Sequence, residues 1–516
     1  MFDATPLLRV YARLRSEGLK RQNYVEAQEK LLFTLLKRAE NTEFGRHYDF
    51  PSIKSVSEYQ KRVPLRTYDD FWNEWWKDKF PRLKNVTWPG LIKRFVISSG
   101  TTTGITKYIP FTPGILRANT KAGLDLFTFH LTNRPKSRIL GGKNFMLLGS
   151  AQVTEEAPGV TSADLSDTMI QNLPFWARLY YFPRGKLYGI KDWEERINTL
   201  APAALKEDIR LFSGVPSWML VFINKLKEIR PESGGRLKQL FPNLEMLVHG
   251  GVKFDPYKKV FSEMLEGSRA ELREVYPASE GFIAIQDRGH GEGLRLLMDH
   301  NVFYEFVPLE ELRSDNPTRH TVKEIEPGIN YAVVMTTAAG LWSYVIGDTV
   351  KFVETTPPRL IVTGRTSYML SAFGEHVIEE ELQKALSSVA AELNNNITDF
   401  SAGALYPSDS SELGRHIFII EFSRPLQSED DLKEAASIID RELKKLNDDY
   451  QAHRADGYGM DSPVLVQAAP GAFAAWMKKR GKAGGQNKVP RVINSQELLS
   501  DLLSFVEKYN SRHDGR

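Results

Sequence analysis

The chain has 516 residues, of which 41% are hydrophobic and 26% are charged, and its formal net charge at pH 7 is +3. This length predicts about two to four domains or lobes, and the composition is that of a soluble globular protein. The near balance of charge gives no electrostatic argument for nucleic acid or an anionic membrane as a partner.

Residue types that the sequence lacks exclude several kinds of chemistry. There are no cysteines, so disulfides, thiolate metal sites and thiol nucleophiles are ruled out. The 10 histidines show neither HxxxH nor HExxH spacing, which argues against a zinc site. The N-terminus has no apolar signal core, and no apolar run reaches about 18 residues. We therefore expect a cytoplasmic protein without a membrane span.

The N-terminal part predicts helices and then a stretch rich in glycine and hydroxyl groups. Apolar spacing favours a helix from Pro6 to Ala39 and another near Ser57. Aromatic residues at helical spacing between Tyr68 and Trp76 are interpreted as core. A strand-like run then leads into Ser98-Ser99-Gly100-Thr101-Thr102-Thr103-Gly104-Ile105-Thr106-Lys107.

This stretch has the composition of a phosphate cradle. Glycines let backbone N–H groups approach an anion, hydroxyls add donors, and Lys107 adds a positive charge. Its spacing is not that of the common nucleotide-binding loop, because Lys107 is not followed by Ser or Thr. A polar hairpin turn explains the same residues about as well, so the stretch alone leaves both interpretations open.

The middle of the chain predicts an α/β alternation followed by a strand-rich section. Short strand-like segments between 290 and 360 favour an antiparallel sheet or a small barrel. Before them, helices are expected over Pro113–Leu131, Ile190–Ile209 and Val215–Ile229, and strands over Phe145–Ser150 and Leu244–Gly251.

A domain boundary is expected near Gly364–Ser367, where a new α+β alternation starts. Ser428 is a good N-cap for a helix that ends near Tyr450. The other expected elements are helices over Glu375–Leu393 and Ser495–Tyr509 and a strand over His416–Phe422. We therefore predict one domain over 1–365 and a second over 366–516.

Four further clusters of small and polar residues follow apolar strands. A Gly-Gly pair is usually a turn, a single carboxylate is usually solvated, and a lysine-rich loop is usually exposed, so each cluster alone favours an ordinary explanation. The clusters are His249-Gly250-Gly251, Tyr276-Pro277-Ala278-Ser279-Glu280-Gly281, Leu341-Trp342-Ser343-Tyr344-Val345-Ile346-Gly347-Asp348 and Gly484-Gly485-Gln486-Asn487-Lys488-Val489-Pro490-Arg491.

In this order, the clusters resemble those of the adenylate-forming enzymes, which include acyl-CoA synthetases, peptide-synthetase adenylation domains and firefly luciferase. Within that superfamily the chain most resembles the Gretchen Hagen family of acyl-acid amido synthetases, particularly its bacterial members. The resemblance extends from about residue 95 to the C-terminus. Its main carriers are the stretch that begins at Ser98, the Tyr276–Gly281 cluster and the run from Gly485 to Arg491.

The resemblance implies an α/β fold in two parts. A large N-terminal domain would hold mixed sheets, flanking helices and a small β-barrel-like part, and a smaller α+β C-terminal domain would act as a mobile lid. The implied enzyme uses ATP and Mg²⁺ to convert a small carboxylic acid into an acyl-adenylate and pyrophosphate, and then transfers the acyl group to an amine such as an amino acid. An acyl-CoA or carrier-protein ligase is the alternative, and a non-catalytic nucleotide-binding protein is a third possibility.

The same resemblance assigns roles to individual residues. Lys488 would neutralise charge at the α-phosphate and the attacking carboxylate, and Glu280 would ligate Mg²⁺. Asp348 would accept hydrogen bonds from the ribose. The hydroxyl residues Ser98, Ser99, Thr101 and Thr102 would hold the ATP phosphates, and the other nucleotide-binding residues would be Gly250, Gly251, Tyr276, Ser279 and Arg365.

Two positions depart from the family pattern. Many relatives carry Asp or Lys at the boundary where this chain has Ser367, and Lys107 stands where plant amido synthetases are irregular.

The pocket for the acid is expected around Leu211–Trp218, whose aromatic and apolar content suggests an aryl or medium-sized apolar acid.

Overall fold

The structure is a computed structural model. The residues it describes are 2–98, 107–147, 153–190, 193–251, 254, 257–289, 291–312, 314–365, 369–375, 377–407, 412–454, 459–480 and 489–512. Within these ranges, every helix is too short or too polar to cross a membrane.

An 11-stranded sheet runs through the N-terminal part in the order β12-β13-β14-β15-β11-β10-β9-β8-β7-β3-β6. The pairs from β6 to β9 are parallel, whereas those from β9 to β12 are antiparallel. The strands expected between 290 and 360 are present, and they continue the large sheet. The strands are β3 (Lys143–Met146), β6 (Tyr181–Phe182), β7 (Ile209–Gly214), β8 (Met246–Gly250), β9 (Glu271–Ala278), β10 (Gly281–Ile285), β11 (Leu294–Leu296), β12 (Val302–Pro308), β13 (Asn330–Thr337), β14 (Tyr344–Thr355) and β15 (Pro358–Arg365).

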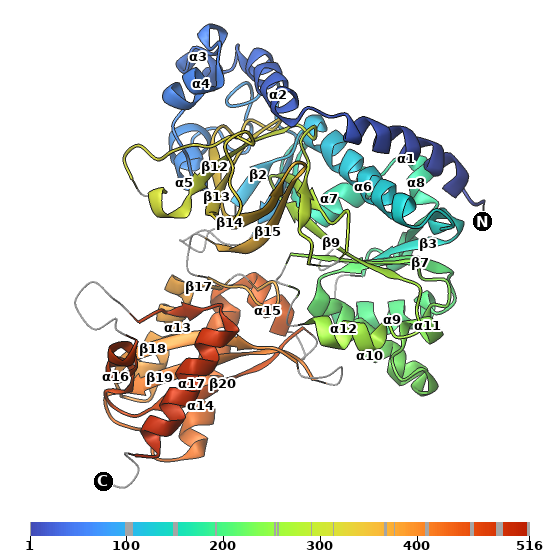
Figure 1. Cartoon of the computed structure of the whole chain (residues 1–516). Coiled ribbons are helices and arrows are strands. Elements are labelled where there is room, and N and C mark those ends of the chain that lie inside the picture. Colours follow the sequence, from blue (N-terminus) through green and yellow to red (C-terminus); the bar gives the residue numbers. More distant parts are fainter. Residues whose placement is uncertain are drawn as a thin grey trace.

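Helices cover both faces of the parallel half of this sheet. On one face, Leu211 and Met246 join the apolar cluster under α1 (Thr5–Lys20) and α6 (Pro113–Asn133). Successive strand residues point to opposite faces, so Phe212 joins the core on the other side, with α9 and α10. Figure 1 shows α1 lying along α6, away from α9 to α12. The remaining helices of this region are α7 (Leu165–Gln171), α8 (Phe175–Arg178), α9 (Trp193–Ala204), α10 (Pro216–Ile229), α11 (Leu237–Leu240) and α12 (Lys258–Met264).

The helix expected over Ile190–Ile209 is shorter than predicted. It ends at Ala204, and Ile209 already pairs with Lys143 as the first residue of β7. The pairing of β7 between β3 and β8 therefore overrides the helical periodicity at this point.

A separate 4-stranded sheet has the order β2-β1-β5-β4. In it β1 (Arg94–Ser98) and β2 (Lys107–Pro110) are antiparallel, with Ser98 opposite Lys107. The two strands expected around the predicted phosphate cradle are thus present, while the loop between them lies outside the described residues. The other strands are β4 (Val153–Ala157) and β5 (Val160–Ala163).

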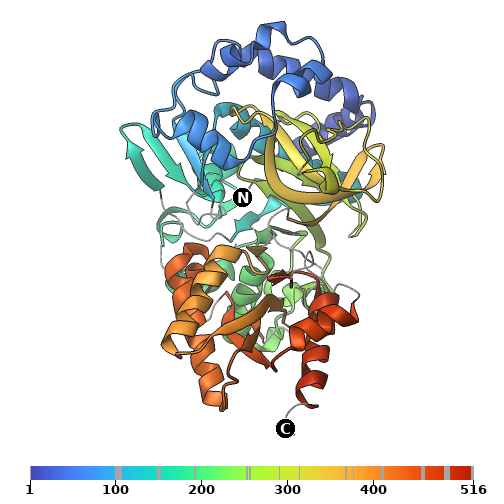
Figure 2. The ribbon, with the colours of Figure 1, turned by 90° about the vertical axis from the view of Figure 1, so that its left-hand side faces the viewer.

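The first helices after α1 cover the antiparallel half of the large sheet. Phe71 and Trp76 are fully buried in its core, and Trp72 and Trp75 pack against them, which confirms the core interpretation of this aromatic stripe. Figure 2 shows these N-terminal helices (blue) above the sheets. Their bounds are α2 (Tyr24–Ala39), α3 (Glu43–His47), α4 (Val56–Arg62) and α5 (Tyr68–Phe71).

The C-terminal part is built on another 4-stranded sheet, ordered β20-β19-β18-β21. Ser428 caps α14 in a capping box, as predicted, but the helix ends at Leu446. Asn447 is extended, and its side chain accepts the N–H of Tyr450 to start a new helix, α15. The elements are β16 (Met369–Leu370), β17 (Val377–Ile378), α13 (Glu379–Glu392), β18 (Ile397–Leu405), β19 (Arg415–Phe422), α14 (Glu429–Leu446), α15 (Asp448–Arg454), β20 (Asp461–Ala468), α16 (Ala472–Lys479), β21 (Val492–Ile493) and α17 (Gln496–Asn510).

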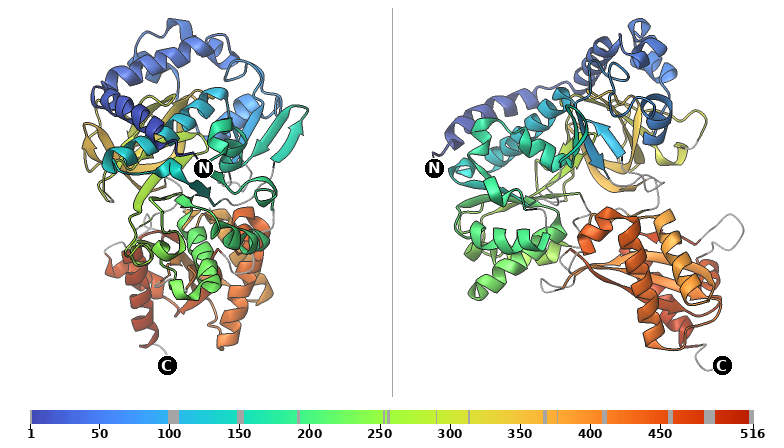
Figure 3. Two further views of the ribbon diagram at one scale, coloured as in Figure 1. Left: turned by 90° about the vertical axis from the view of Figure 1, so that its right-hand side faces the viewer. Right: turned by 180° about the vertical axis from the view of Figure 1, so that it is seen from behind.

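The N-terminal and C-terminal parts are in contact beside the large sheet. The Tyr257 hydroxyl donates to the carbonyl of Ala372 at 3.3 Å, and the rings of Trp218 and His453 lie 5.3 Å apart. Figure 3 shows the C-terminal elements, coloured orange to red, on one side of the parallel half of the sheet. Arg365 is the last residue of the large sheet, and the domain boundary expected there stays a prediction.

Candidate active site

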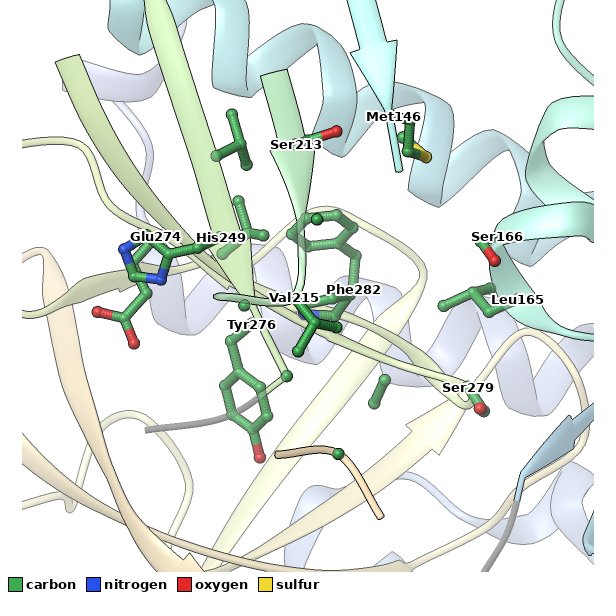
Figure 4. Close-up of a pocket in the computed structure, with 18 of the residues that line it drawn as sticks. Met146, Leu165, Ser166, Ser213, Val215, His249, Glu274, Tyr276, Ser279 and Phe282 are labelled. Carbon is green, nitrogen blue, oxygen red and sulfur yellow. The ribbon is translucent and has the colours of Figure 1, made fainter. Parts of the chain in front are cut away.

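The ends of β1, β8, β9, β14 and β15 meet around one cavity of about 2120 Å³. Figure 4 shows His249 and Tyr276 on one side of the cavity and Met146 and Leu165 on the other. We call these the polar side and the apolar side. Every candidate residue that lies in the described ranges lines this cavity: Ser98, Gly250, Gly251, Tyr276, Ser279, Glu280, Asp348 and Arg365.

Asp348 is held by two neighbours on the polar side. The Tyr276 hydroxyl donates to its Oδ2 at 2.6 Å, and Arg365 Nε lies 3.0 Å from its Oδ1, directly across the β14–β15 pair. The Asp348 carboxylate raises the pKa of Arg365. Burial, and then Asp348, raise the pKa of the Tyr276 hydroxyl well above its usual range, so it stays a donor. These contacts fix a carboxylate at the cavity wall, where it can accept hydrogen bonds from ligand hydroxyls.

Glu280 is placed by a tight turn. Ser279 and Glu280 connect β9 to β10, with Ala278 paired to Gly281. The Glu280 side chain is only 7% exposed, and it accepts a hydrogen bond from the Tyr344 hydroxyl at 3.0 Å. Burial raises the pKa of Glu280, and Lys107 opposes that shift. Because burial destabilises the ionised form, a cation bound beside this carboxylate would be strongly favoured.

Lys107 faces the same cavity from the first position of β2. Its ammonium lies 5.6 Å from the centre of the Tyr68 ring. Burial lowers the pKa of Lys107, while Glu280 acts to raise it. Lys107 thus adds positive charge to this side of the cavity. The other four candidates, Ser99, Thr101, Thr102 and Lys488, lie outside the described residues.

The Gly250–Gly251 turn requires glycine for steric reasons. A Cβ on Gly250 would lie 2.4 Å from the carbonyl oxygen of Val275, closer than any side chain can approach. At Gly251 the backbone has φ = +85°, which only glycine adopts without strain. The turn therefore leaves a bare backbone edge on the cavity wall, against which a flat ligand group can lie.

The apolar side is formed by α6, α7 and α8 together with the ends of β3 and β7. The segment expected to form the acid pocket contributes Leu211, Ser213, Gly214, Val215 and Trp218 to the lining. The sequence did not single out Leu165 and Met169 of α7, because nothing local distinguishes a cavity-lining helix from any other short amphipathic helix. Tyr344 was also missed as a partner of Glu280, although it lies inside one of the singled-out clusters.

Another group of possible metal ligands has a different explanation. Asp125, Asp299 and His300 place ligand atoms within 4.8 Å of one another. Arg15 donates to both carboxylates at 2.7 to 2.9 Å, and Lys121 lies 2.7 Å from Asp299. These cations already compensate the carboxylates, so Glu280, which faces the open cavity, is the better cation ligand.

Three family models match the chain in order. They describe the N-terminal, central and C-terminal domains of the GH3 family and match residues 18–187, 295–365 and 380–497.

Curated relatives match almost the whole chain at low identity. "Indole-3-acetic acid-amido synthetase GH3.4" of Arabidopsis thaliana is 21% identical, with 94% of this chain and 92% of the relative covered. "Jasmonoyl--L-amino acid synthetase JAR4" of Nicotiana attenuata is 22% identical, with 80% and 82% covered.

Solved structures share the fold. "AtGH3.15 acyl acid amido synthetase in complex with 2,4-DB" gives a TM-score of 0.61 at 17% identity, with 98% of this chain and 97% of that chain covered. A 2-hydroxyisobutyryl-CoA ligase gives a TM-score of 0.56 at 15% identity, with 94% and 92% covered. The mixed α/β fold, with a large N-terminal and a smaller C-terminal part, is therefore that of the predicted class.

Proposed function

The chain belongs to the GH3 family, and we propose that it is an ATP-dependent acyl-acid amido synthetase. It would join a small carboxylic acid to an amine, in the first instance an amino acid. The observation that carries the proposal is the two-sided cavity, in which a buried Glu280 and a clamped Asp348 face an apolar pocket. The curated relatives named above, an indole-3-acetic acid-amido synthetase and a jasmonoyl–L-amino acid synthetase, support the same activity.

The reaction needs charge compensation and alignment. A carboxylate is a poor electrophile because oxide is a poor leaving group. Transfer of AMP from ATP to the acid supplies a good one and releases pyrophosphate, and the amine then displaces AMP. In this proposal Ser98, Ser99, Thr101 and Thr102 hold the phosphates, and Asp348 accepts the ribose hydroxyls. Lys488 brings positive charge to the reacting carboxylate and α-phosphate.

The charge arrangement also fits Mg²⁺. Hard divalent cations prefer carboxylate oxygens, and Glu280 offers its carboxylate at the cavity wall with Tyr344 fixing one oxygen. A bound Mg²⁺ would offset phosphate charge during the first step. Within the proposal Glu280 holds the ion, while Gly250, Gly251, Tyr276, Ser279 and Arg365 line the space for the nucleotide.

The direct test is acid-dependent release of pyrophosphate. Purified protein with ATP, Mg²⁺ and a panel of carboxylic acids should release pyrophosphate only when a suitable acid is present, and should form an amide when mixed amino acids are added. Thioester formation with CoA and no amide would instead establish the CoA ligase alternative. Nucleotide binding without any acid-dependent pyrophosphate release would rule out both enzymes.

Lys488 gives a sharper test, because another lysine, Lys478, precedes it in the sequence and serves as a matched control. Lys488→Ala should lower adenylation by about 100-fold or more, since one charge at the reacting centre is removed. Lys478→Ala, which removes a lysine from α16 outside the proposed site, should leave the rate unchanged. Normal turnover by Lys488→Ala would exclude the role given to this residue. The mobility of the C-terminal lid, the bacterial type and the cytoplasmic location stay predictions.

A further inference from the structure

Three residues that line the cavity from α6, β3 and β6 each carry a buried polar side-chain atom without a partner among the described residues. Asn119 of α6 and Tyr181 of β6 are 6% and 8% exposed. The Oδ1 of Asn119, the hydroxyl of Tyr181 and the Oδ1 of Asn144 in β3 have no hydrogen-bond partner in the part of the chain that the structure describes. All three residues line the cavity. We call them the polar triad.

Strand pairing places two members of the triad side by side. Asn144 pairs in parallel with Tyr181 of β6 and with Leu211 of β7. Paired residues present their side chains to the same face of a sheet, and Leu211 belongs to the cluster that packs under α6. Asn144 and Tyr181 therefore point to the face that α6 covers, the helix that carries Asn119.

The third member is covered by a flexible side chain. Among the described residues, the partner to which the Asn119 amide group donates is the thioether sulfur of Met169, at 3.6 Å. A thioether is a weak acceptor on an unbranched, adaptable side chain, so a ligand that enters between α6 and α7 can displace it. Displacement of Met169 would free the Asn119 amide group to bond that ligand.

Leaving these groups unpaired costs free energy. A buried polar group without a partner costs about 1–3 kcal/mol, and Phe in place of Tyr181 or Leu in place of Asn119 would avoid that cost. The neighbouring Tyr188 shows the ordinary arrangement, because its hydroxyl donates to Asp167 at 2.7 Å. Unpaired groups that line a cavity are instead explained by a partner on the ligand.

We propose that the polar triad binds a hydrogen-bond donor, in the first instance a hydroxyl, carried by the acyl acid away from its carboxylate. This inference rests on the proposed function and narrows it. The acid would be a hydroxylated aryl or medium-sized acid, whose apolar body packs on α6 and α7. Its hydroxyl would donate to the Asn119 oxygen, with Asn144 and Tyr181 completing the polar surface.

The test compares matched acids. Benzoate, phenylpropanoate and octanoate are each assayed beside their hydroxyl and methyl derivatives for acid-dependent pyrophosphate release. For at least one framework, the hydroxyl derivative should exceed the methyl derivative by about tenfold or more in kcat/KM. If every hydroxyl and methyl pair differs by less than about threefold, the inference is overturned while the proposed function stands. If no acid releases pyrophosphate, the proposed function fails first.

Two tyrosines make a matched control. Tyr181→Phe should bring the ratio of kcat/KM for the hydroxyl acid to that for the methyl acid to within about threefold of unity. The thermal midpoint should not fall, because the substitution removes only an unpaired hydroxyl. Tyr188→Phe should leave the ratio unchanged, since its hydroxyl is already bonded to Asp167. Asn119→Leu should reduce this ratio as Tyr181→Phe does, because it removes the acceptor oxygen. An unchanged ratio in both Tyr181→Phe and Asn119→Leu would overturn the inference even if the wild type prefers hydroxyl acids.

Discussion

Two clusters of buried charge in this protein have similar ingredients and opposite electrostatics. The cavity cluster consists of Lys107, Tyr276, Glu280, Asp348 and Arg365. The α6 cluster consists of His130, Arg210, Glu245, Glu271 and Arg273, and it lies where the end of α6 meets the starts of β7, β8 and β9. Burial raises the pKa of Glu280 in the cavity cluster. In the α6 cluster burial is overcome by hydrogen bonds from His130 and other partners, and the pKa of Glu271 falls to about 2.

The difference lies in how many donors meet each carboxylate. Glu271 receives bonds at 2.8 to 2.9 Å from His130, Arg134 and Arg273, so its charge is fully compensated within the fold. Glu280 accepts a hydrogen bond from the neutral hydroxyl of Tyr344 and faces the cavity, and the charge of Lys107 does not overcome the effect of burial on its pKa. A fully compensated carboxylate stabilises the structure, whereas an under-compensated one is suited to bind a cation.

The largest effect is expected from Glu280→Gln. It removes the proposed Mg²⁺ ligand, so kcat/KM for adenylation should fall by about 1000-fold. Thermal stability should be unchanged or higher, because the variant removes a charge that burial disfavours and keeps an acceptor for Tyr344. Pyrophosphate release and a thermal melt measure the two effects. If Glu280→Gln lowered the thermal midpoint but kept its adenylation activity, Glu280 would be a stabilising residue and not a cation ligand.

Glu271→Gln should do the opposite. It leaves His130 and Arg273 buried without their carboxylate, and the free energy of unfolding should fall by about 2–3 kcal/mol in a denaturant titration. Activity below the melting temperature should be unaffected. Glu263→Gln, at an exposed position of α12, is the control and should change neither quantity. If Glu271→Gln and Glu263→Gln had the same free energy of unfolding, the α6 cluster would contribute nothing to the stability of the fold.

The loss of stability caused by Glu271→Gln should depend on pH, in a way that follows from the pKa shifts of Glu271 and His130. The pKa of Glu271 falls from its usual 4.5 to about 2, so its stabilisation is present above pH 4.5 and lost as the pH falls toward 2. The pKa of His130 is instead raised, because the hydrogen bonds that it donates to Glu245 and Glu271 overcome burial. Its contribution to stability is complete below pH 6.5 and lost at higher pH. The difference between wild type and variant should therefore be largest between about pH 4.5 and 6.5 and shrink on both sides. A difference independent of pH would exclude this origin.

These clusters also show what the sequence could reveal. Each of the motifs that contain Tyr276, Glu280 and Asp348 has an ordinary explanation when taken alone. Their roles were predicted from the resemblance of the ordered set to the adenylate-forming enzymes, and the fold brings all three residues to one cavity. The polar triad could not be predicted, because Asn119, Asn144 and Tyr181 come from separate elements. What distinguishes them is that one polar atom of each has no hydrogen-bond partner among the described residues, and the sequence does not show this. Likewise, the helix expected up to Tyr450 is divided at Asn447, whose side chain prefers to cap α15.

Asp348→Asn should have an intermediate effect. The amide still accepts from Tyr276 but loses its charge pairing with Arg365, so KM for ATP should rise by about tenfold with a smaller change in kcat. Asp287→Asn is the matched control, since Asp287 pairs with Arg359 at 2.7 to 2.8 Å and does not line the cavity. That control should lower stability and leave KM unchanged. The same KM in wild type and Asp348→Asn would remove Asp348 from the nucleotide site.

The smallest effect is expected from Arg134→Gln, which changes the exposed edge of the α6 cluster. Arg134 donates to Glu271 at 2.9 Å, but its side chain is 54% exposed, so water replaces most of what is lost. The free energy of unfolding should fall by less than about 0.5 kcal/mol, with activity unchanged. A loss as large as that of Glu271→Gln would mean that Arg134, and not the buried pair His130 and Arg273, holds the charge of Glu271. The contrast between the two clusters would then depend on a surface ion pair, and added salt would abolish it.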